Sequence, residues 1–190
     1  MEFSVTTRGK GTFVTQPKIT QELTELTGFV EDMQALGRTP TARVLDKRVV
    51  AADEVVARHL ALAPGTLVVR LRRVRLADGV PMSFDETYLP RELGEKVTEN
   101  DLEAEPVFAL LEDKYGTPLV EAEYKLEAAA ADPVTAHALR VPAGSPIFLI
   151  ERTSYTTGNR PVDYERLYYR GDLIRFVTRL ARRPRAPMQK

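Results

Sequence analysis

The sequence predicts an α+β fold in which short helices flank an antiparallel sheet. Stretches rich in Val, Ile and Tyr are separated by turn pairs such as Asp78-Gly79 and Gly158-Asn159, which are typical of β-hairpins. Segments with helical spacing or helix-capping residues interrupt this run of strands. Hairpin-linked strands favour an antiparallel sheet. The 190 residues, 43% of them hydrophobic, allow one main domain with a sizeable core.

The first third of the chain should contain part of a hairpin, two helices and a strand. Residues 8–14 place two glycines and two cations in a tight turn before a β-prone Thr-Phe-Val. Apolar residues at three- and four-residue steps predict an amphipathic helix over 21–37, ending at Gly37. A strand is expected over 42–50 and a short helix over 52–62.

The remaining elements follow from turn, capping and alternation signals. We expect a hairpin of strands 66–77 and 80–89, a helix over 106–115 ended by Gly116, and a helix that begins at Asp132-Pro133 and ends at Leu139. Further strands are expected at 120–130, 147–156 and 162–169, with a last one at 173–180 closing the sheet.

The composition excludes several classes of protein. Twenty-seven basic and 27 acidic residues give no net charge, whereas chains that bind nucleic acid on their own usually carry a basic excess. With no cysteine and only His59 and His137, we expect no metal and no cofactor. No apolar run is long enough to span a bilayer and no signal-peptide pattern is present, so we expect a cytoplasmic protein without membrane contact.

No catalytic motif is present, so we expect no catalytic residues and no enzymatic activity. The chain has no nucleophile elbow, no phosphate-binding glycine loop and no histidine pair at metal spacing. His59 and His137 lie on predicted short helices and are expected to be structural or surface residues.

Two arginines on one strand are the main candidates for ligand binding. Side chains alternate across a strand, so Arg73 and Arg75 share a face with Leu67, Val69 and Leu71. Their planar donor groups suit a carboxylate or phosphate. The alternative is that both arginines pair with protein carboxylates across the sheet.

Acidic and aromatic residues on other strands are further candidates. Asp85 on the partner strand could accept a hydrogen bond from a ligand or pair with one of the two arginines. Asp163 and Tyr169 point to one side of the strand over 162–169.

The stretch Arg8-Gly9-Lys10-Gly11-Thr12-Phe13-Val14 resembles the wing of the winged helix-turn-helix in GntR-type regulators. The resemblance implies that Arg8, Lys10, Gly11 and Thr12 belong to a partial DNA-contacting wing. A wing adds at best backbone contacts, because the recognition helix reads the major groove. We therefore expect operator binding only through a winged-helix domain that this chain lacks.

Residues 20–180 resemble the UTRA effector domain of the HutC subfamily. Four segments carry the resemblance in order: 29–37, 73–90, 108–116 and 160–172. It implies a chorismate-lyase-like fold, a homodimer and a pocket for a small-molecule effector. By position in the family it also implies that the ligand-binding residues are Arg73, Arg75, Asp85, Phe108, Asp163 and Tyr169.

The sequence departs from the phosphosugar sensors of that family. Pro106 and Phe108 stand where those proteins have hydroxyl side chains, as do Gly28 and Val30 near the first helix. Several neutral phosphate donors are thus missing, so the effector is left open as a phosphorylated sugar, a carboxylate or another metabolite.

The preferred interpretation is the effector-sensing part of a regulator, with repression favoured. Two alternatives are a dimerisation module that antagonises a full-length regulator and an enzyme of chorismate-lyase type; the latter rests on fold analogy alone. The expected division is a wing remnant and linker at 1–18, the ligand-binding and dimerisation domain at 19–182, and a basic flexible tail at 183–190.

Overall fold

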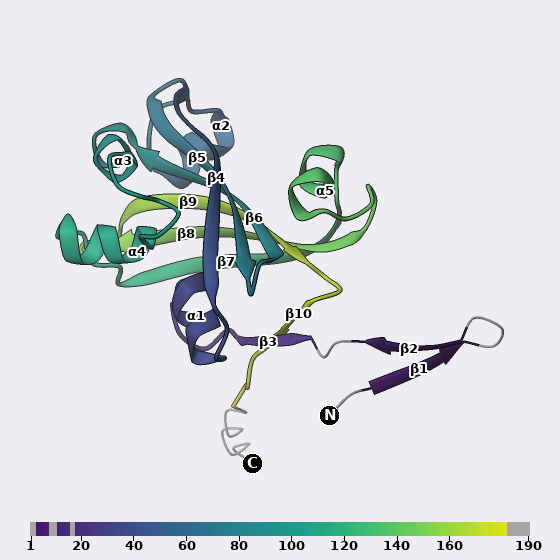
Figure 1. The fold of residues 1–190 in the computed structure, drawn as a ribbon. Helices are drawn as coiled ribbons and strands as arrows, with labels where there is room; N and C mark the ends of the chain where they lie inside the picture. The colour runs from purple at the N-terminus through teal and green to yellow at the C-terminus, as the bar shows by residue number, and fades with distance from the viewer. Residues whose placement is uncertain (1–2, 8–10, 16–17, 182–190) are drawn as a thin grey trace, which may run out of the picture.

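The structure, a computed structural model, describes residues 3–7, 11–15 and 18–181, with side chains described from residue 18 onward. Within these residues the main feature is a six-stranded antiparallel sheet (Figure 1). Its strand order is β4-β5-β6-β9-β8-β7. The bounds are β4 Pro40–Ala51, β5 Leu67–Ala77, β6 Val80–Pro90, β7 Glu121–Ala130, β8 Pro146–Thr156 and β9 Arg160–Arg170. This confirms the α+β, antiparallel prediction.

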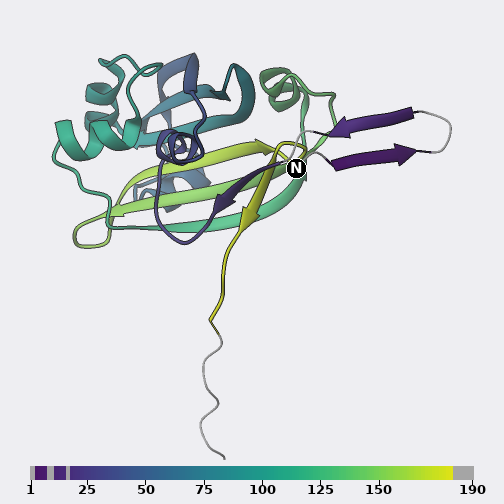
Figure 2. The same ribbon diagram turned by 60° about the horizontal axis from the view of Figure 1, so that its bottom comes forward.

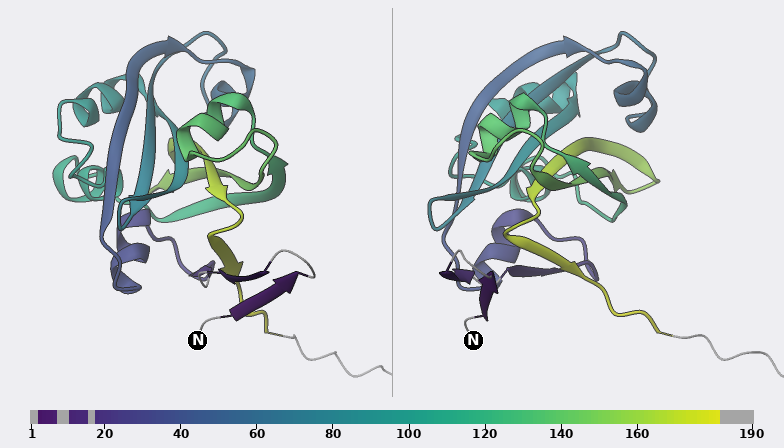
Figure 3. Two further views of the ribbon diagram at one scale, coloured as in Figure 1. Left: turned by 45° about the vertical axis from the view of Figure 1, so that its right-hand side comes forward. Right: turned by 90° about the vertical axis from the view of Figure 1, so that its right-hand side faces the viewer.

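Helices cover both faces of this sheet. Helices α1 (Phe29–Ala35), α3 (Arg91–Thr98) and α4 (Val107–Ala109) pack on the face that carries Arg73 and Arg75, called here the polar face. Helices α2 (Glu54–His59) and α5 (Pro133–Leu139) pack on the opposite face. The sheet is strongly curved, so β4 and β5 rise away from β8 and β7 (Figure 3).

Local sequence explains where several elements begin and turn. The Asp53 carboxylate accepts a hydrogen bond from the Val56 amide at 2.8 Å, which caps α2. Asp132 caps α5 in the same way. The β5–β6 turn needs left-handed backbone at Asp78 and at Gly79, where φ is +78°, and Asp and Gly tolerate that conformation better than other residues.

The amphipathic helix predicted over 21–37 is wrong in its first half. Residues Ile19–Glu22 form strand β3, and the helix begins only at Phe29. The strand wins because its backbone pairs in parallel with β10 (Ile174–Val177), an interaction between distant parts of the chain that helical spacing cannot reveal. The end of the helix was predicted correctly, with Gly37 at φ +69°.

Three other expectations need correction. The strand expected over 173–180 does not close the main sheet, because β10 pairs with β3 instead. Helix α3 was not predicted. The helix expected over 106–115 is divided into α4 and a π-helix, η1 (Leu110–Lys114), before Gly116 turns the chain at φ +58°.

The N-terminal hairpin prediction is confirmed for the backbone. Strands β1 (Phe3–Thr7) and β2 (Gly11–Thr15) pair antiparallel and form a separate ribbon (Figure 2). Gly11 and Thr12 begin β2, whereas Arg8 and Lys10 lie outside the described residues. So does the tail predicted at 183–190.

Candidate functional site

Strand register brings charged side chains of four strands together on the polar face. Arg73 lies opposite Asp85, which lies opposite Leu167 on β9. One step along the face, Thr87 lies opposite Glu165, which lies opposite Arg152 on β8. All these side chains are almost completely buried.

Two of the three buried arginines have a carboxylate partner. Arg75 Nε donates to Asp85, which also accepts from the Ser83 hydroxyl at 2.7 Å. Arg152 pairs with Glu165. Burial alone would raise the pKa of Glu165, but the neighbouring guanidinium groups lower it overall.

Arg73 differs from these two arginines. It is 1% exposed and has no ion pair with the described residues. Its one hydrogen bond to them runs from Nη1 to the Leu102 carbonyl at 3.5 Å. Its Nε and Nη2 atoms have no hydrogen-bond partner among the described residues. Burial, followed by repulsion from Arg75, lowers the pKa of Arg73 to about 9. The fold thus holds a cation that an added anion would stabilise.

Asp163 is a buried carboxyl group that, like Arg73, lacks an ion-pair partner among the described residues. It is fully buried; its Oδ1 accepts from the Ser154 amide at 3.2 Å, while its Oδ2 has no partner within the described part of the chain. Burial, followed by repulsion from Glu165, raises the pKa of Asp163 to about 7. Asp163 therefore releases its proton near neutral pH.

A cavity of about 220 Å³ opens onto Arg73 and Arg75. Its walls come from α1, β4, β5 and the segment around residues 102–106. A smaller cavity of about 40 Å³ shares Phe29, Val30, Arg75 and Pro106 with it and reaches Arg152. The space suits a small metabolite, because drug-sized ligands usually occupy about 300 Å³ or more.

The predicted site residues come together only in part. Arg73 and Arg75 line the larger cavity and Phe108 the smaller, while Asp85 lies behind Arg75 as its ion-pair partner. Asp163 and Tyr169 lie on the same face but line neither cavity. The alternative that the arginines pair with protein carboxylates is therefore confirmed for Arg75 and wrong for Arg73.

Arg152 and Glu165 belong to the cluster but were missed in the sequence. The Arg152 guanidinium lies 4.4 Å from the Phe108 ring centroid, a cation–π contact, and Nη1 donates to the Tyr124 hydroxyl at 2.9 Å. The alternation that places Asp163 on this face also places Glu165 there. Only the β8–β9 register, however, shows that Arg152 faces it.

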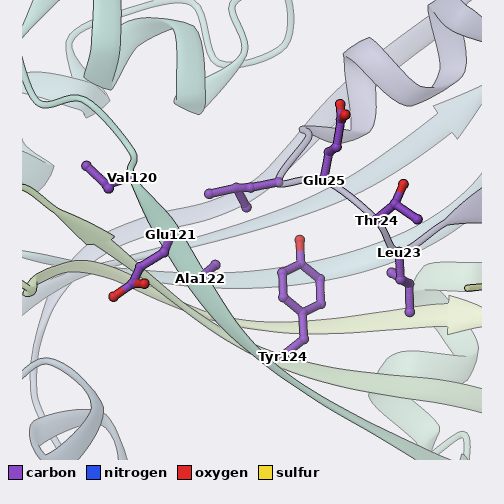
Figure 4. Close-up of a pocket in the computed structure, with 8 residues that line it drawn as sticks. Leu23, Thr24, Glu25, Val120, Glu121, Ala122 and Tyr124 are labelled. Carbon is purple, nitrogen blue, oxygen red and sulfur yellow. The ribbon is translucent and has the colours of Figure 1, made fainter. Parts of the chain in front are cut away.

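A separate hollow of about 360 Å³ lies between residues 23–26 and the edge strand β7 (Figure 4). Val120, Ala122 and Tyr124 form one wall and Glu25 lies on the other. The described residues that line it include no arginine or lysine, so it offers no match for an anion.

The histidines take no part in the cluster. His59 stacks on Tyr164 with ring centroids 4.2 Å apart and hydrogen-bonds to the Thr153 hydroxyl at 2.7 Å, on the opposite face. In the described ranges, no group of three His, Cys, Asp or Glu residues could hold a metal ion. Among the same residues no helix is both long and apolar enough to cross a membrane.

Comparisons with known proteins agree with this architecture. Residues 35–175 match the family model described as the UTRA domain. The chain is 33% identical over 170 residues to the HTH-type transcriptional repressor NagR of Bacillus subtilis, covering 90% of this chain and 70% of that protein. It is 28% identical over 175 residues to the histidine utilization repressor of Pseudomonas putida, covering 92% and 69%. These relatives are GntR-family, HutC-type repressors.

Solved structures give the same picture. The crystal structure of PhnF from Mycobacterium smegmatis superposes with a TM-score of 0.81 at 29% identity, covering 94% of this chain and 78% of that one. The effector domain of the same protein superposes with a TM-score of 0.80 at 26% identity, covering 86% and 100%. The chain spans about two thirds of the length of several curated relatives, for example 65% of the regulator Rv0792c of Mycobacterium tuberculosis.

Proposed function

The chain belongs to the UTRA family of effector domains found in GntR/HutC-type transcription repressors, and we propose that it senses a small anionic metabolite at Arg73 and Arg75. Effector binding then alters operator binding by a homodimer in the cytoplasm. DNA contact belongs to a winged-helix domain, in keeping with the HTH-type names of the relatives. No catalytic step is assigned to the site.

The observation that carries the proposal is the unmatched charge of Arg73. A buried guanidinium without a carboxylate is costly for the fold, so its presence in a cavity wall supports the proposal that an external anion binds there. Arg75 lies beside it with its Nε already bonded to Asp85, which orients the planar group toward the same cavity.

Helix α1 supplies a route from the cavity toward the N-terminal part of the chain. Phe29 and Val30 line the cavity, and Phe29 is also buried in the core next to Met33. Residues 23–28 connect α1 to β3, which lies next to the N-terminal hairpin in the sequence. An effector that contacts α1 in only one arrangement of the dimer shifts the population toward that arrangement. A nearly complete switch requires about 5.5 kcal/mol of differential binding.

The test is thermal unfolding of the full chain against a panel of phosphosugars, carboxylates and amino acids, with Arg73→Met as the binding-site variant. A ligand at a hundred times its dissociation constant adds about 2.7 kcal/mol to the free energy of unfolding, or several degrees in Tm. The matched control is Arg72→Met, because Arg72 is the adjacent arginine on the opposite face, paired with Glu86.

We expect at least one anion to raise the Tm of the wild type and of Arg72→Met but not of Arg73→Met. An anion that stabilises all three proteins equally would contradict the proposal, because its binding would not depend on the polar face.

A further inference from the structure

The charges around the cavity bear on the class of anion that it accepts. Each of the two ion pairs on the polar face, Arg75–Asp85 and Arg152–Glu165, is internally neutral. Among the described residues that line the two cavities, Arg73 is the one guanidinium without a carboxylate, and Asp163, the unpaired carboxyl of the same face, lines neither cavity. The inner wall of the cavity therefore offers one uncompensated positive charge.

Two exposed acidic residues add negative charge to the cavity wall. Glu103 and Glu105 both line the cavity. Glu103 Oε1 accepts from the Val44 amide at 2.9 Å and Glu105 Oε1 from the Asp101 amide at 3.2 Å, so both carboxylates are held at the wall. Two acidic groups in the wall oppose a multiply charged anion more than a singly charged one.

Arg152 is the second cation that a doubly charged ligand would need. It reaches the smaller cavity, which adjoins the larger one through Phe29, Val30 and Arg75. Glu165 holds its Nη2 group, and Phe108 lies over its guanidinium face. Glu165 is fixed in turn by the Thr87 hydroxyl at 2.9 Å, so the ion pair is built into the sheet.

We propose that this site selects a singly charged carboxylate over a phosphomonoester dianion, and that Glu165 is the specificity-determining residue because it neutralises Arg152. The inference rests on the proposed function. A carboxylate matches Arg73 charge for charge, and the planar guanidinium group suits its two oxygens. A phosphomonoester, whose second ionisation occurs near pH 6, brings a second charge that the wall does not balance.

The experiment compares acetate with inorganic phosphate at pH 8 and constant ionic strength, using thermal unfolding of the full chain up to about 100 mM anion. We expect acetate to bind wild type at least ten-fold more tightly than phosphate. In Glu165→Gln, which keeps the side-chain size and frees Arg152, we expect phosphate to gain ten-fold or more relative to acetate. Glu86→Gln is the control, because Glu86 pairs with Arg72 on the opposite face.

The outcomes separate this inference from the proposed function. Tighter binding of phosphate than acetate by wild type, abolished in Arg73→Met, overturns the carboxylate selection and leaves the anion sensor standing. Binding of neither anion overturns the carboxylate selection, and the metabolite panel with Arg73→Met then decides the anion sensor separately. An unchanged preference in a folded Glu165→Gln overturns the role of Glu165.

If Glu165→Gln fails to fold, the double variant Arg152→Met with Glu165→Met replaces it. Removing both partners of a buried ion pair is usually tolerated far better than removing one. Arg73 remains the single unpaired cation of the cluster in that variant, so the preference for acetate should persist. Its loss would overturn the inference.

Discussion

Adjacent arginines on β5 experience opposite surroundings on the two faces of one sheet. On the opposite face, Arg72 pairs with Glu86 at 2.6 Å. On the polar face, Arg73 is buried without a carboxylate partner in the described part of the chain. The same contrast holds across the sheet. Five of its buried unpartnered side-chain atoms lie on the polar face, and one, Arg70 Nε, lies on the opposite face, on a side chain already paired with Asp46.

The contrast between the two faces assigns a structural role to one face and ligand binding to the other. Buried polar groups in native proteins normally have partners, so a concentration of exceptions on one face needs a reason. The opposite face is closed by α2 and α5, and Arg70 Nε is the one buried side-chain atom of the described sheet on that face without a partner, which suits a structural role. The polar face holds the unpaired Arg73 guanidinium beside a cavity, which suits ligand binding.

Asp85→Asn should have the largest effect on stability. The substitution leaves the Arg75 guanidinium buried without its counter-charge and weakens the hydrogen bond from Ser83. Breaking one side of a buried ion pair costs about 3 kcal/mol or more. Urea denaturation of the purified variant measures this loss. A loss below about 1 kcal/mol would mean that the polar face is solvated and that the comparison fails.

Arg73→Met should have the reverse effect in the absence of ligand. The variant removes a buried, unmatched charge and retains most of the aliphatic packing, so the free energy of unfolding should rise by about 1–3 kcal/mol. For a chain of this length, each kcal/mol corresponds to roughly 2–4 °C in Tm. A destabilised variant would indicate that Arg73 is already satisfied within the protein.

Asp163→Asn should change how stability depends on pH. The pKa of Asp163 is raised to about 7 in the folded state, from 3.8 in the unfolded state. The stability that the protonated Asp163 side chain contributes is therefore fully present below pH 3.8 and is lost as the pH rises toward 7. The asparagine does not ionise beside Glu165, so at pH 8 the variant should be more stable than wild type by about 1–2 kcal/mol.

Thermal unfolding of both proteins between pH 4 and pH 8 tests this effect. The difference in stability between variant and wild type should grow with pH over that range. A difference that stays constant would mean that the fold does not raise the pKa of Asp163 above its unfolded value.

Arg72→Met should have the smallest effect. The Arg72 side chain is 32% exposed, so solvent weakens its ion pair with Glu86, and we expect a loss of about 1 kcal/mol. Anion binding should not change, because this side chain faces away from the cavity. Calorimetric titration with the best anion of the panel checks this; a changed affinity would show that the two faces are coupled.

The sequence predicted the main sheet well because its signals are local. Strands β5 and β6 are joined by Asp78-Gly79, and β8 and β9 by a turn through Gly158-Asn159, where both residues have positive φ. The Asp53 and Asp132 caps likewise mark the starts of α2 and α5.

The candidate site was predictable from the sequence only where the alternation of side chains along a single strand places residues on one face. Alternation along β5 puts Arg73 and Arg75 on one face, and alternation along β9 does the same for Asp163 and Tyr169. Which arginine has a carboxylate depends on side-chain geometry between strands, so the sequence left both alternatives open. Arg152 was missed for the same reason, since its partner lies on β9.

By itself the sequence determined the antiparallel class, most strand limits and the face on which the two arginines lie, because turns, caps and period-two alternation act within a few residues. The tertiary structure alone decided that residues 19–22 form a strand rather than a helix, since their backbone partners lie at 174–177. It also decided that Arg75 and Arg152 are neutralised while Arg73 is not, since charge pairing depends on which side chains the register and the covering helices bring within reach.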